Sequence, residues 1–260
     1  MDKFVIEGGR PLKGVVEVAG SKNAVLPVLA ASLLTDEPLR IPNAPRVSDV
    51  KSMLKVLESL GSRTVQRADG SIEVCSAALP KDAAGWEYVR KMRGSIAVLG
   101  PILSRTGRAT ISQPGGCVIG VRPIDLHIKG MQALGAKVSS QHGDVIAEAP
   151  RGGLIGADLY LGGAQGPTVL GTANVMMAAT LAKGRTVIHG AACEPEVVDL
   201  GDCLIKMGAR IRGLGSPRIE INGVDKLHGA THAVIPDRIE AGTFVIAGAI
   251  TGGAVRVEKC

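Results

Sequence analysis

A glycine-rich segment, residues 113–127 (QPGGCVIGVRPIDLH), carries the residue types best suited to chemistry. Its thiol, Cys117, lies between Gly115–Gly116 and Gly120, which predicts a loop whose backbone can approach a ligand closely and can move. Arg122 comes just before a predicted helix start, where free backbone N–H groups and a guanidinium favour an anion. Because a thiolate forms more readily beside a cation, Cys117 is a candidate nucleophile or proton donor. A purely structural cysteine is the competing interpretation.

Two further cationic segments could bind anions. Lys22 and Asn23 precede an apolar helix, and an amine with an amide at a helix start suits a phosphate or a carboxylate. This is not a P-loop, because the pattern GxxxxGK[ST] is absent. Residues 90–93 (RKMR) form a basic cluster before another predicted helix, and Asp237 and Glu240 are three residues apart at a third. For all three segments, an ordinary solvated helix start is the alternative.

Two other patterns carry less weight. His228 and His232 have HxxxH spacing, but Gly229 between them argues against a rigid helical metal site, so no metal is expected. Cys117 and His127 could suggest a hydrolase dyad, but no motif supplies a third member. We therefore expect neither a metal nor a cofactor.

An internal repeat organises these segments. A Leu/Met-Gly-small triplet recurs at Gly61, Gly135 and Gly208, at spacings of 74 and 73 residues. Each glycine follows a predicted amphipathic helix that is opened by an aspartate: Asp49, Asp125 and Asp199. An Ala/Leu-rich helix and a short strand come before this helix, and two short strands come after it. The predicted unit is therefore helix–strand–helix–strand–strand, present three times in an α/β protein. A fourth copy begins at Thr243 and stops at Cys260, so we expect a truncated second domain.

Composition narrows the class of protein. The 260 residues are 45% apolar and 21% charged, which is typical of a globular protein. The net charge of +6 invites a nucleic-acid interpretation, but the basic residues are scattered and five aromatic residues are few for stacking on bases. Small anionic ligands are the preferred partners, with neither nucleic acid nor membrane. The five cysteines include no CxxC pair and no leader sequence is visible, which favours a reducing cytoplasm.

Several segments resemble the enolpyruvyl transferase family, and within it the UDP-N-acetylglucosamine 1-carboxyvinyltransferases. They are EVAGSKNAVLPVLAASLL, VRKMRGSIAVLGPIL, PGGCVIGVRPIDLHIKGMQALGA, EPEVVDL and PDRIEAGTF. The similarity runs from residue 3 to 260, and the GGC…GxRPxDLH motif is very specific. The related shikimate-pathway transferase would have a GSKS-type first motif and no loop cysteine.

The resemblance implies a pair of inside-out α/β barrels, each built from three repeats, with the active site between them. The N-terminal stretch of the family crosses into the second domain. We therefore expect a complete three-repeat domain over residues 22–234, and a partial, truncated second domain formed by residues 1–21 and 235–260.

The reaction implied by the resemblance transfers enolpyruvate from phosphoenolpyruvate to the 3′-hydroxyl of UDP-N-acetylglucosamine, releasing phosphate. It is the first committed step of peptidoglycan precursor synthesis, and so belongs to cell-wall biogenesis, cell shape and cell division. Cys117 resembles the proton donor of the family, which sits on a mobile lid and is the target of fosfomycin. Lys22, which we also count as catalytic, Arg93 and Arg122 resemble the cations that neutralise phosphate, carboxylate and diphosphate. Asn23 resembles a polar contact to the reacting groups.

The remaining site residues implied by the resemblance bind the nucleotide. Asp125 and its neighbouring backbone would face uracil within a strip made of Arg122, Pro123, Ile124, Asp125 and Leu126. Thr168 and Val169 fit the diphosphate loop, although Leu170 stands where the family has a glycine. The general base of the family, an Asp, lies in the second domain beyond residue 260, so the isolated chain is expected to be inactive. A non-catalytic UDP-sugar-binding protein is the alternative.

Overall fold

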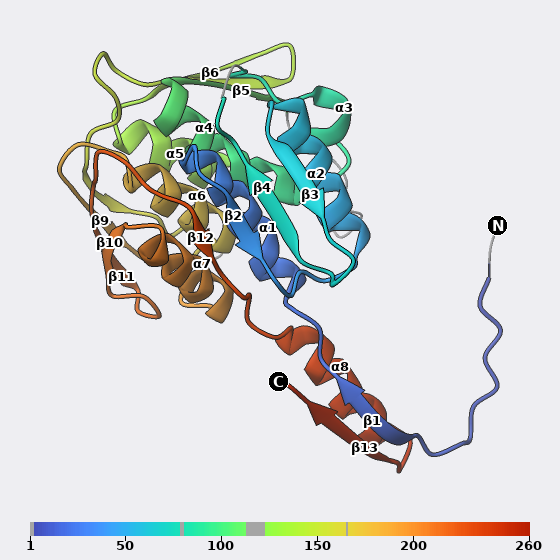
Figure 1. The fold of residues 1–260 in the computed structure, drawn as a ribbon. Helices are drawn as coiled ribbons and strands as arrows, with labels where there is room; N and C mark the ends of the chain where they lie inside the picture. Colours follow the sequence, from blue (N-terminus) through green and yellow to red (C-terminus); the bar gives the residue numbers. More distant parts are fainter. Residues whose placement is uncertain (1–2, 79–80, 113–122, 165) are drawn as a thin grey trace.

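The computed structural model describes residues 3–78, 81–112, 123–164 and 166–260. Figure 1 shows a large unit from which a small arm projects. The large unit contains three successive repeats, and each has the helix–strand–helix–strand–strand order predicted from the sequence. The α/β class is therefore confirmed.

The bounds of the elements are as follows. The first repeat contains α1 (Lys22–Ala31), the 3₁₀ helix η1 (Ser32–Leu34), β2 (Leu39–Ile41), α2 (Ser48–Ser59), β3 (Arg63–Gln66) and β4 (Ile72–Cys75). The second contains α3 (Trp86–Val89), the 3₁₀ helix η2 (Arg93–Val98), α4 (Leu99–Thr106), β5 (Arg108–Ser112), α5 (Asp125–Ala133), β6 (Lys137–Gln141) and β7 (Asp144–Glu148). The third contains β8 (Asp158–Tyr160), α6 (Val169–Ala179), β9 (Arg185–His189), α7 (Pro195–Lys206), β10 (Arg210–Arg212), β11 (Arg218–Asn222) and β12 (Ala230–Thr231).

The three repeats are interlocked through their sheets. In each repeat, the three strands of the predicted unit form an antiparallel sheet, in the orders β2-β4-β3, β5-β7-β6 and β9-β11-β10. The first strand of the repeat also takes a parallel neighbour from outside these three strands. Thus β8 pairs with β9, β12 pairs with β2, and a single bridge joins Ala83 to Thr110 of β5. Because β12 lies at the end of the third repeat and pairs with β2 of the first, the third repeat is joined back to the first.

The repeated glycines end the second helix of each unit in the same way. Gly61, Gly135 and Gly208 have φ of 101°, 92° and 101°, a left-handed conformation that glycine adopts without steric cost. In the first unit, the N–H of Gly61 donates to the carbonyl of Glu58 and that of Ser62 donates to the carbonyl of Leu57. The same pair of bonds recurs after α5 and α7, so all three helices end in a Schellman motif.

The start of α7 differs from the sequence expectation. Asp199 was expected to open this helix, but α7 begins at Pro195 and Asp199 lies in its second turn, where it is buried. A proline at the first helical position loses no intrahelical hydrogen bond, because that N–H has no partner there. Asp49 and Asp125 do lie in the first turns of α2 and α5.

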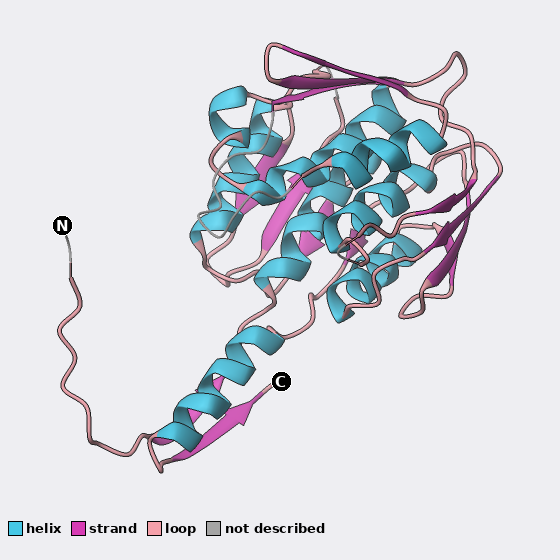
Figure 2. Ribbon diagram, turned by 180° about the vertical axis from the view of Figure 1, so that it is seen from behind, coloured by secondary structure: helices cyan, strands magenta, loops and turns pink. Residues whose placement is uncertain are grey.

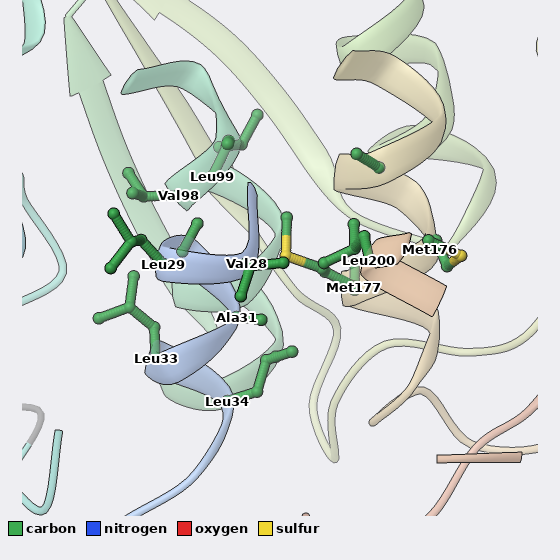
Figure 3. Packing of buried hydrophobic residues seen from close by; sticks show 14 of the residues in the cluster. Val28, Leu29, Ala31, Leu33, Leu34, Val98, Leu99, Met176, Met177 and Leu200 are labelled. Carbon is green, nitrogen blue, oxygen red and sulfur yellow. The ribbon is translucent and has the colours of Figure 1, made fainter. Parts of the chain in front are cut away.

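Most helices of the large unit lie between its sheets (Figure 2). Because α1 and α6 are apolar on almost every side, they can be buried all round, and α6 packs against α1, α4, α5 and α7. Figure 3 shows Leu29 of α1, Leu99 of α4, Met177 of α6 and Leu200 of α7 in this central cluster. The core is aliphatic, as the scarcity of aromatic residues predicts.

The arm consists of β1 (Lys13–Glu17), α8 (Arg238–Ile250) and β13 (Ala254–Glu258). The strands β1 and β13 pair in parallel, which brings the two ends of the chain into one sheet. Two segments that run side by side link the arm to the large unit. They are residues 18–21 and residues 232–237, and a bridge joins Gly20 to Pro236. We call residues 232–237 the crossover. Within the described ranges, no helix has the length and apolar character needed to cross a bilayer.

Candidate functional site

A cavity of about 450 Å³ opens where the N-terminal parts of α1, α2, η2, α6, α7 and α8 meet. Residues far apart in the sequence line it. They are Lys22, Asn23, Leu26, Asp49, Lys91, Met92, Arg93, Gly94, Val169, Leu170, Glu194, Glu196 and Arg238. Four of these side chains are cationic and three are carboxylates, so the cavity is charged with a positive balance.

Lys22 is positioned by the start of α1. Ser21 caps this helix, because its hydroxyl accepts from the N–H of Ala24. The N–H of Lys22 donates to Asp237 at 3.1 Å. Its Nζ lies 2.8 Å from Asp49 Oδ2 in the first turn of α2, and both side chains are partly exposed. A partly exposed pair of this kind contributes at most about 1 kcal/mol, so a bound anion can compete for the ammonium.

Arg238 and Glu196, which also line the cavity, form a two-point pair. Arg238 Nε lies 2.9 Å from Glu196 Oε1, and Nη2 lies 3.2 Å from Oε2. Glu196 is buried in the first turn of α7, whereas Arg238 begins α8 and is half exposed. The hydrogen bonds to Glu196 raise the pKa of the Arg238 guanidinium. The pair joins the arm to the large unit at the wall of the cavity.

Arg93 connects the cavity to the start of α5. Its Nη2 donates to the carbonyl oxygen of Pro123 at 3.0 Å. Pro123 and Ile124 lead directly into α5, which begins at Asp125. Arg93 therefore holds the N-terminal end of α5 beside the cavity.

Behind this end of α5, Asn174 of α6 ties three elements together. Its Oδ1 accepts from the N–H of Gly100, and its Nδ2 donates to the carbonyl of Ile96 and contacts His127 Nδ1 at 3.0 Å. Since the amide nitrogen can only donate, His127 Nδ1 must accept and the imidazole is neutral. Burial, and then the charge of Arg93, lower the pKa of His127 to about 4. The side chains of Asn174 and His127, which hold the start of α5 in place, are therefore uncharged.

The cavity brings together some of the residues expected from the sequence. Lys22, Asn23, Arg93 and Val169 line it. Thr168 lies next to it as the N-cap of α6, where its hydroxyl accepts from Gly171 N–H at 3.1 Å.

Four other expected site residues that the structure describes, Pro123, Ile124, Asp125 and Leu126, are not among those that line the cavity. Ile124, Asp125 and Leu126 lie at the start of α5, with Pro123 joined to Arg93. Cys117 and Arg122 lie outside the described residues.

Several charged groups of the cavity, among them Asp49, Glu196 and Arg238, were not expected as site residues from the sequence. Asp49 was interpreted only as a helix start, and neither Glu196 nor Arg238 was assigned to a site. A signal existed for the last two, since both lie in the family-like segments EPEVVDL and PDRIEAGTF. Their pairing joins residues 42 positions apart, which no local pattern reveals.

The structure also describes the surroundings of two other sequence patterns. Asp237 caps α8 by accepting from the N–H groups of Ile239 and Glu240, so the pair of acidic residues forms a helix start. His228 is exposed and His232 is buried against Asp199. In the described part of the chain, no three His, Cys, Asp or Glu side chains gather as they would around a metal ion.

The arrangement is suited to anions that carry more than one charge. Lys22, Lys91, Arg93 and Arg238 line one cavity, and Asn23 adds an amide that can donate or accept. Partial desolvation strengthens these interactions relative to water. The described lining can therefore bind and orient phosphate or carboxylate groups.

Comparison with known proteins identifies the class. The sequence profile of the EPSP synthase (3-phosphoshikimate 1-carboxyvinyltransferase) family matches residues 6–260. The chain belongs to this family of carboxyvinyl transferases. Among solved structures, the enolpyruvyl transferase NikO from Streptomyces tendae is similar with a TM-score of 0.83 and 22% identity, over 97% of this chain and 59% of that one. EPSP synthase from Acinetobacter baumannii has a TM-score of 0.72 and 18% identity, over 97% and 57%. These two likenesses show the fold.

Curated relatives narrow the similarity further. The UDP-N-acetylglucosamine 1-carboxyvinyltransferase of Akkermansia muciniphila is 55% identical over 259 residues, and that of Koribacter versatilis is 50% identical over 263. Both alignments include all of this chain and 60% of the relative, so the chain spans about 60% of their length. The resemblance seen in the sequence is therefore confirmed at the level of these relatives.

Proposed function

We propose that the chain supplies the substrate-binding wall of a UDP-N-acetylglucosamine 1-carboxyvinyltransferase. The reaction would transfer enolpyruvate from phosphoenolpyruvate to the 3′-hydroxyl of UDP-N-acetylglucosamine. The observation that carries the proposal is the convergence of Lys22, Asn23, Arg93 and Val169 on one cavity of about 450 Å³. These residues come from three distant segments; those of Lys22–Asn23 and Arg93 resemble the family closely, and that of Val169 resembles it only loosely.

The chemistry requires two charge-separating steps. In the addition, the 3′-hydroxyl loses its proton to the general base, which in the family is an Asp of the second domain, its oxygen bonds to carbon 2 of phosphoenolpyruvate, the carbon 2–carbon 3 double bond becomes single, and carbon 3 gains a proton. In the elimination, carbon 3 loses a proton, the bond from carbon 2 to the phosphate oxygen breaks, and phosphate leaves. Cations that face the phosphate and the carboxylate stabilise the charge that develops at each step. We assign this role to Lys22, Arg93 and Arg122, with Asn23 as a polar contact to the reacting groups.

We assign the proton transfer to Cys117 on the strength of the family motif, and its reactivity provides a test. Fosfomycin opens its epoxide on a thiolate, forming a carbon–sulfur bond and leaving a hydroxyl, and mass spectrometry locates the adduct. We expect it on Cys117. Cys203 is a poor competitor, because burial, and then the charge of Asp199, raise its pKa to about 12. An adduct found instead on Cys193, which is exposed, would overturn the assignment.

The nucleotide half of the substrate is assigned to the start of α5 and the start of α6. Pro123, Ile124, Asp125 and Leu126 would follow the uracil, and Thr168 and Val169 would meet the diphosphate. The positive end of the helix dipole at the start of α6 favours such an anion. With this assignment we place the chain in peptidoglycan precursor synthesis in the cytoplasm.

We also propose a division into two domains. Residues 22–234 would form one complete inside-out α/β barrel. Residues 1–21 and 235–260 would belong to a second. The parallel pairing of β1 with β13 supports the second grouping.

Calorimetry tests the proposed function. UDP-N-acetylglucosamine is titrated into the chain with and without phosphoenolpyruvate, and we expect binding whose affinity changes when phosphoenolpyruvate is present. Lys22→Met should weaken binding roughly 10- to 100-fold, because a hydrogen bond to a charged group is lost. Lys55→Met on the exposed face of α2 is the matched control and should leave the affinity unchanged.

Two outcomes would contradict the proposal. Absence of UDP-sugar binding would remove the function altogether. Binding that ignores phosphoenolpyruvate would favour the non-catalytic UDP-sugar-binding protein. The expectation that these residues alone release no phosphate stays a prediction, and a phosphate assay on the same mixture tests it.

A further inference from the structure

A second group of polar side chains, none of which lines the cavity, joins α7 to the crossover: Asp199 and Lys206 of α7, and His232. His232 Nε2 is 3.0 Å from Asp199 Oδ1, and the two side chains are only 3% and 4% exposed. The other ring nitrogen, Nδ1, is 3.2 Å from Lys206 Nζ. Asp199 and Lys206 are two turns apart on α7, so one helix holds both nitrogens of the imidazole.

The contacts fix the proton on this ring. An ammonium can only donate, so His232 Nδ1 accepts from Lys206. A neutral imidazole then carries its proton on Nε2 and donates it to Asp199. Cys203, on the same helix, remains a neutral thiol, since burial and the charge of Asp199 raise its pKa to about 12. The group therefore has one orientation, with the charges of Asp199 and Lys206 offsetting each other.

His232 begins the crossover, whose backbone is bound along its length. The N–H of His232 donates to the carbonyl of Arg40 at 2.9 Å. The Asn43 amide accepts from the N–H of Val234 at 2.9 Å and donates to its carbonyl at 2.8 Å. The N–H of Asp237 donates to the carbonyl of Ala19 at 2.9 Å. These hydrogen bonds fix the backbone of the crossover from His232 to the start of α8.

At the far end of the crossover, α7 makes its second contact. Arg238 pairs with Glu196, which lies three residues before Asp199 and so one turn away along α7. Two buried carboxylates on one helix therefore hold the crossover at both of its ends. The end near Arg238 belongs to the cavity, where Asp237 also accepts from the N–H of Lys22.

We propose that His232 is a positioning residue for the cavity. Fixed between Asp199 and Lys206, it anchors the start of the crossover on α7, so that Asp237 and Arg238 meet Lys22 and Glu196 in register. Only the substrate measurement below rests on the proposed function. The structural measurements do not need it.

Two substitutions separate the two contacts of the ring. In His232→Gln the amide nitrogen can replace Nε2 and still donate to Asp199, while Lys206, which is exposed, turns to solvent. In His232→Asn the side chain reaches only the position of Nδ1, and Asp199 is left buried without its partner. We expect amide hydrogen exchange at Val234, Asp237, Ile239 and Glu240 to rise about tenfold or more in His232→Asn and little in His232→Gln. Exchange in α6 should not change in either variant.

Two further measurements and a matched control complete the test. Nitrogen-resolved NMR of the wild-type ring should show the Nε2–H tautomer. Affinity for UDP-N-acetylglucosamine should fall in His232→Asn and be largely kept in His232→Gln. The matched control is His189→Asn, because His189 pairs with Asp158 at 2.8 Å on the surface, and it should change none of these quantities.

Several outcomes would overturn the proposal. These are an Nδ1–H or doubly protonated ring, crossover exchange in His232→Asn that equals the wild type, or a rise of equal size in α6, which would indicate a general loss of stability. If His232→Asn does not fold, the wild-type tautomer and His232→Gln still decide. If the wild type binds no UDP-sugar, the proposed function fails, whereas the exchange and NMR results still test the positioning role.

Discussion

Helices α6 and α8 both follow the pattern of the helix that opens a repeat, yet their burial is opposite. Nine of the eleven residues of α6 are buried, whereas only Gly248 is buried among the thirteen residues of α8. Other helices surround α6, while α8 packs on β13 and leaves Ile246 and Ile250 61% and 79% exposed. An apolar helical pattern therefore predicts the element and its place in the repeat, but its neighbours decide what it contributes to stability.

The largest expected effect is on the core around α6. Met176→Ala should lower the free energy of unfolding by about 2–5 kcal/mol, because Met176 is fully buried and its removal leaves a cavity. Ile246→Ala on α8 should change it by less than about 0.5 kcal/mol. Urea denaturation of the two variants measures both values. Equal losses would mean that α8 is as well packed as α6.

The next effect is a pH dependence of stability that arises from His127, whose Nδ1 is hydrogen-bonded to Asn174 of α6. Its pKa is lowered to about 4 in the folded chain, against about 6.5 when unfolded, so the unfolded state binds the proton more readily. Stability from this group is complete above about pH 6.5, falls as the pH drops, and is lost near pH 4, a total of at most about 3 kcal/mol. Unfolding curves between pH 7 and pH 4 for the wild type and His127→Asn should converge towards low pH. Parallel curves would contradict the buried neutral ring.

Glycine substitutions should give effects of opposite sign in the two regions. A Cβ on Gly130 of α5 would overlap Val175 of α6, so Gly130→Ala should destabilise by about 1–3 kcal/mol. Gly242 of α8 has open space around it, so Gly242→Ala should stabilise by about 0.5–1 kcal/mol through helix propensity. Thermal unfolding measures both. A loss of stability in Gly242→Ala would show that α8 is more closely packed than its surroundings indicate.

The smallest effect on folding is expected from Ile246→Lys. The side chain at this position points to solvent, so stability should change by less than about 0.5 kcal/mol. Its charge should reduce association between the exposed apolar residues of α8 in neighbouring molecules. Light scattering over a concentration series checks this, with the equally exposed Val245→Lys as a second variant. Unchanged scattering in both would mean that this face does not drive self-association.

Much of the fold could be predicted from the sequence because its signals are local. The triplets at Gly61, Gly135 and Gly208 end three helices as expected, and the paired strands after each are present. The strands β8 and β12 were missed, because both lie outside the repeated helix–strand–helix–strand–strand unit and pair with strands distant in the sequence. The strands β2 and β10 are as short as β8, but the repeat itself indicated them.

The residues of the candidate site likewise fall into those that could be found from local sequence and those whose pairing could not. Lys22, Asn23 and Arg93 were found because each lies in a short segment with its own recognisable motif, whereas Val169 came from a segment that matches the family only loosely. The pairing of Lys22 with Asp49, and that of Arg238 with Glu196, depends on how helices meet in space. His232 was weighed only as a metal ligand, because its partners Asp199 and Lys206 become visible only once the crossover lies on α7.

The closure of the first sheet by β12 has a consequence for biosynthesis. Strand β2 pairs with β4 on one side, but its parallel neighbour on the other side, β12, is made about 190 residues later. At a translation rate of about 5–20 residues per second, β2 waits roughly 10–40 s on the ribosome with one edge unpaired. During that time the nascent chain presents an open strand edge to its surroundings, and only the arrival of Ala230 and Thr231 covers it.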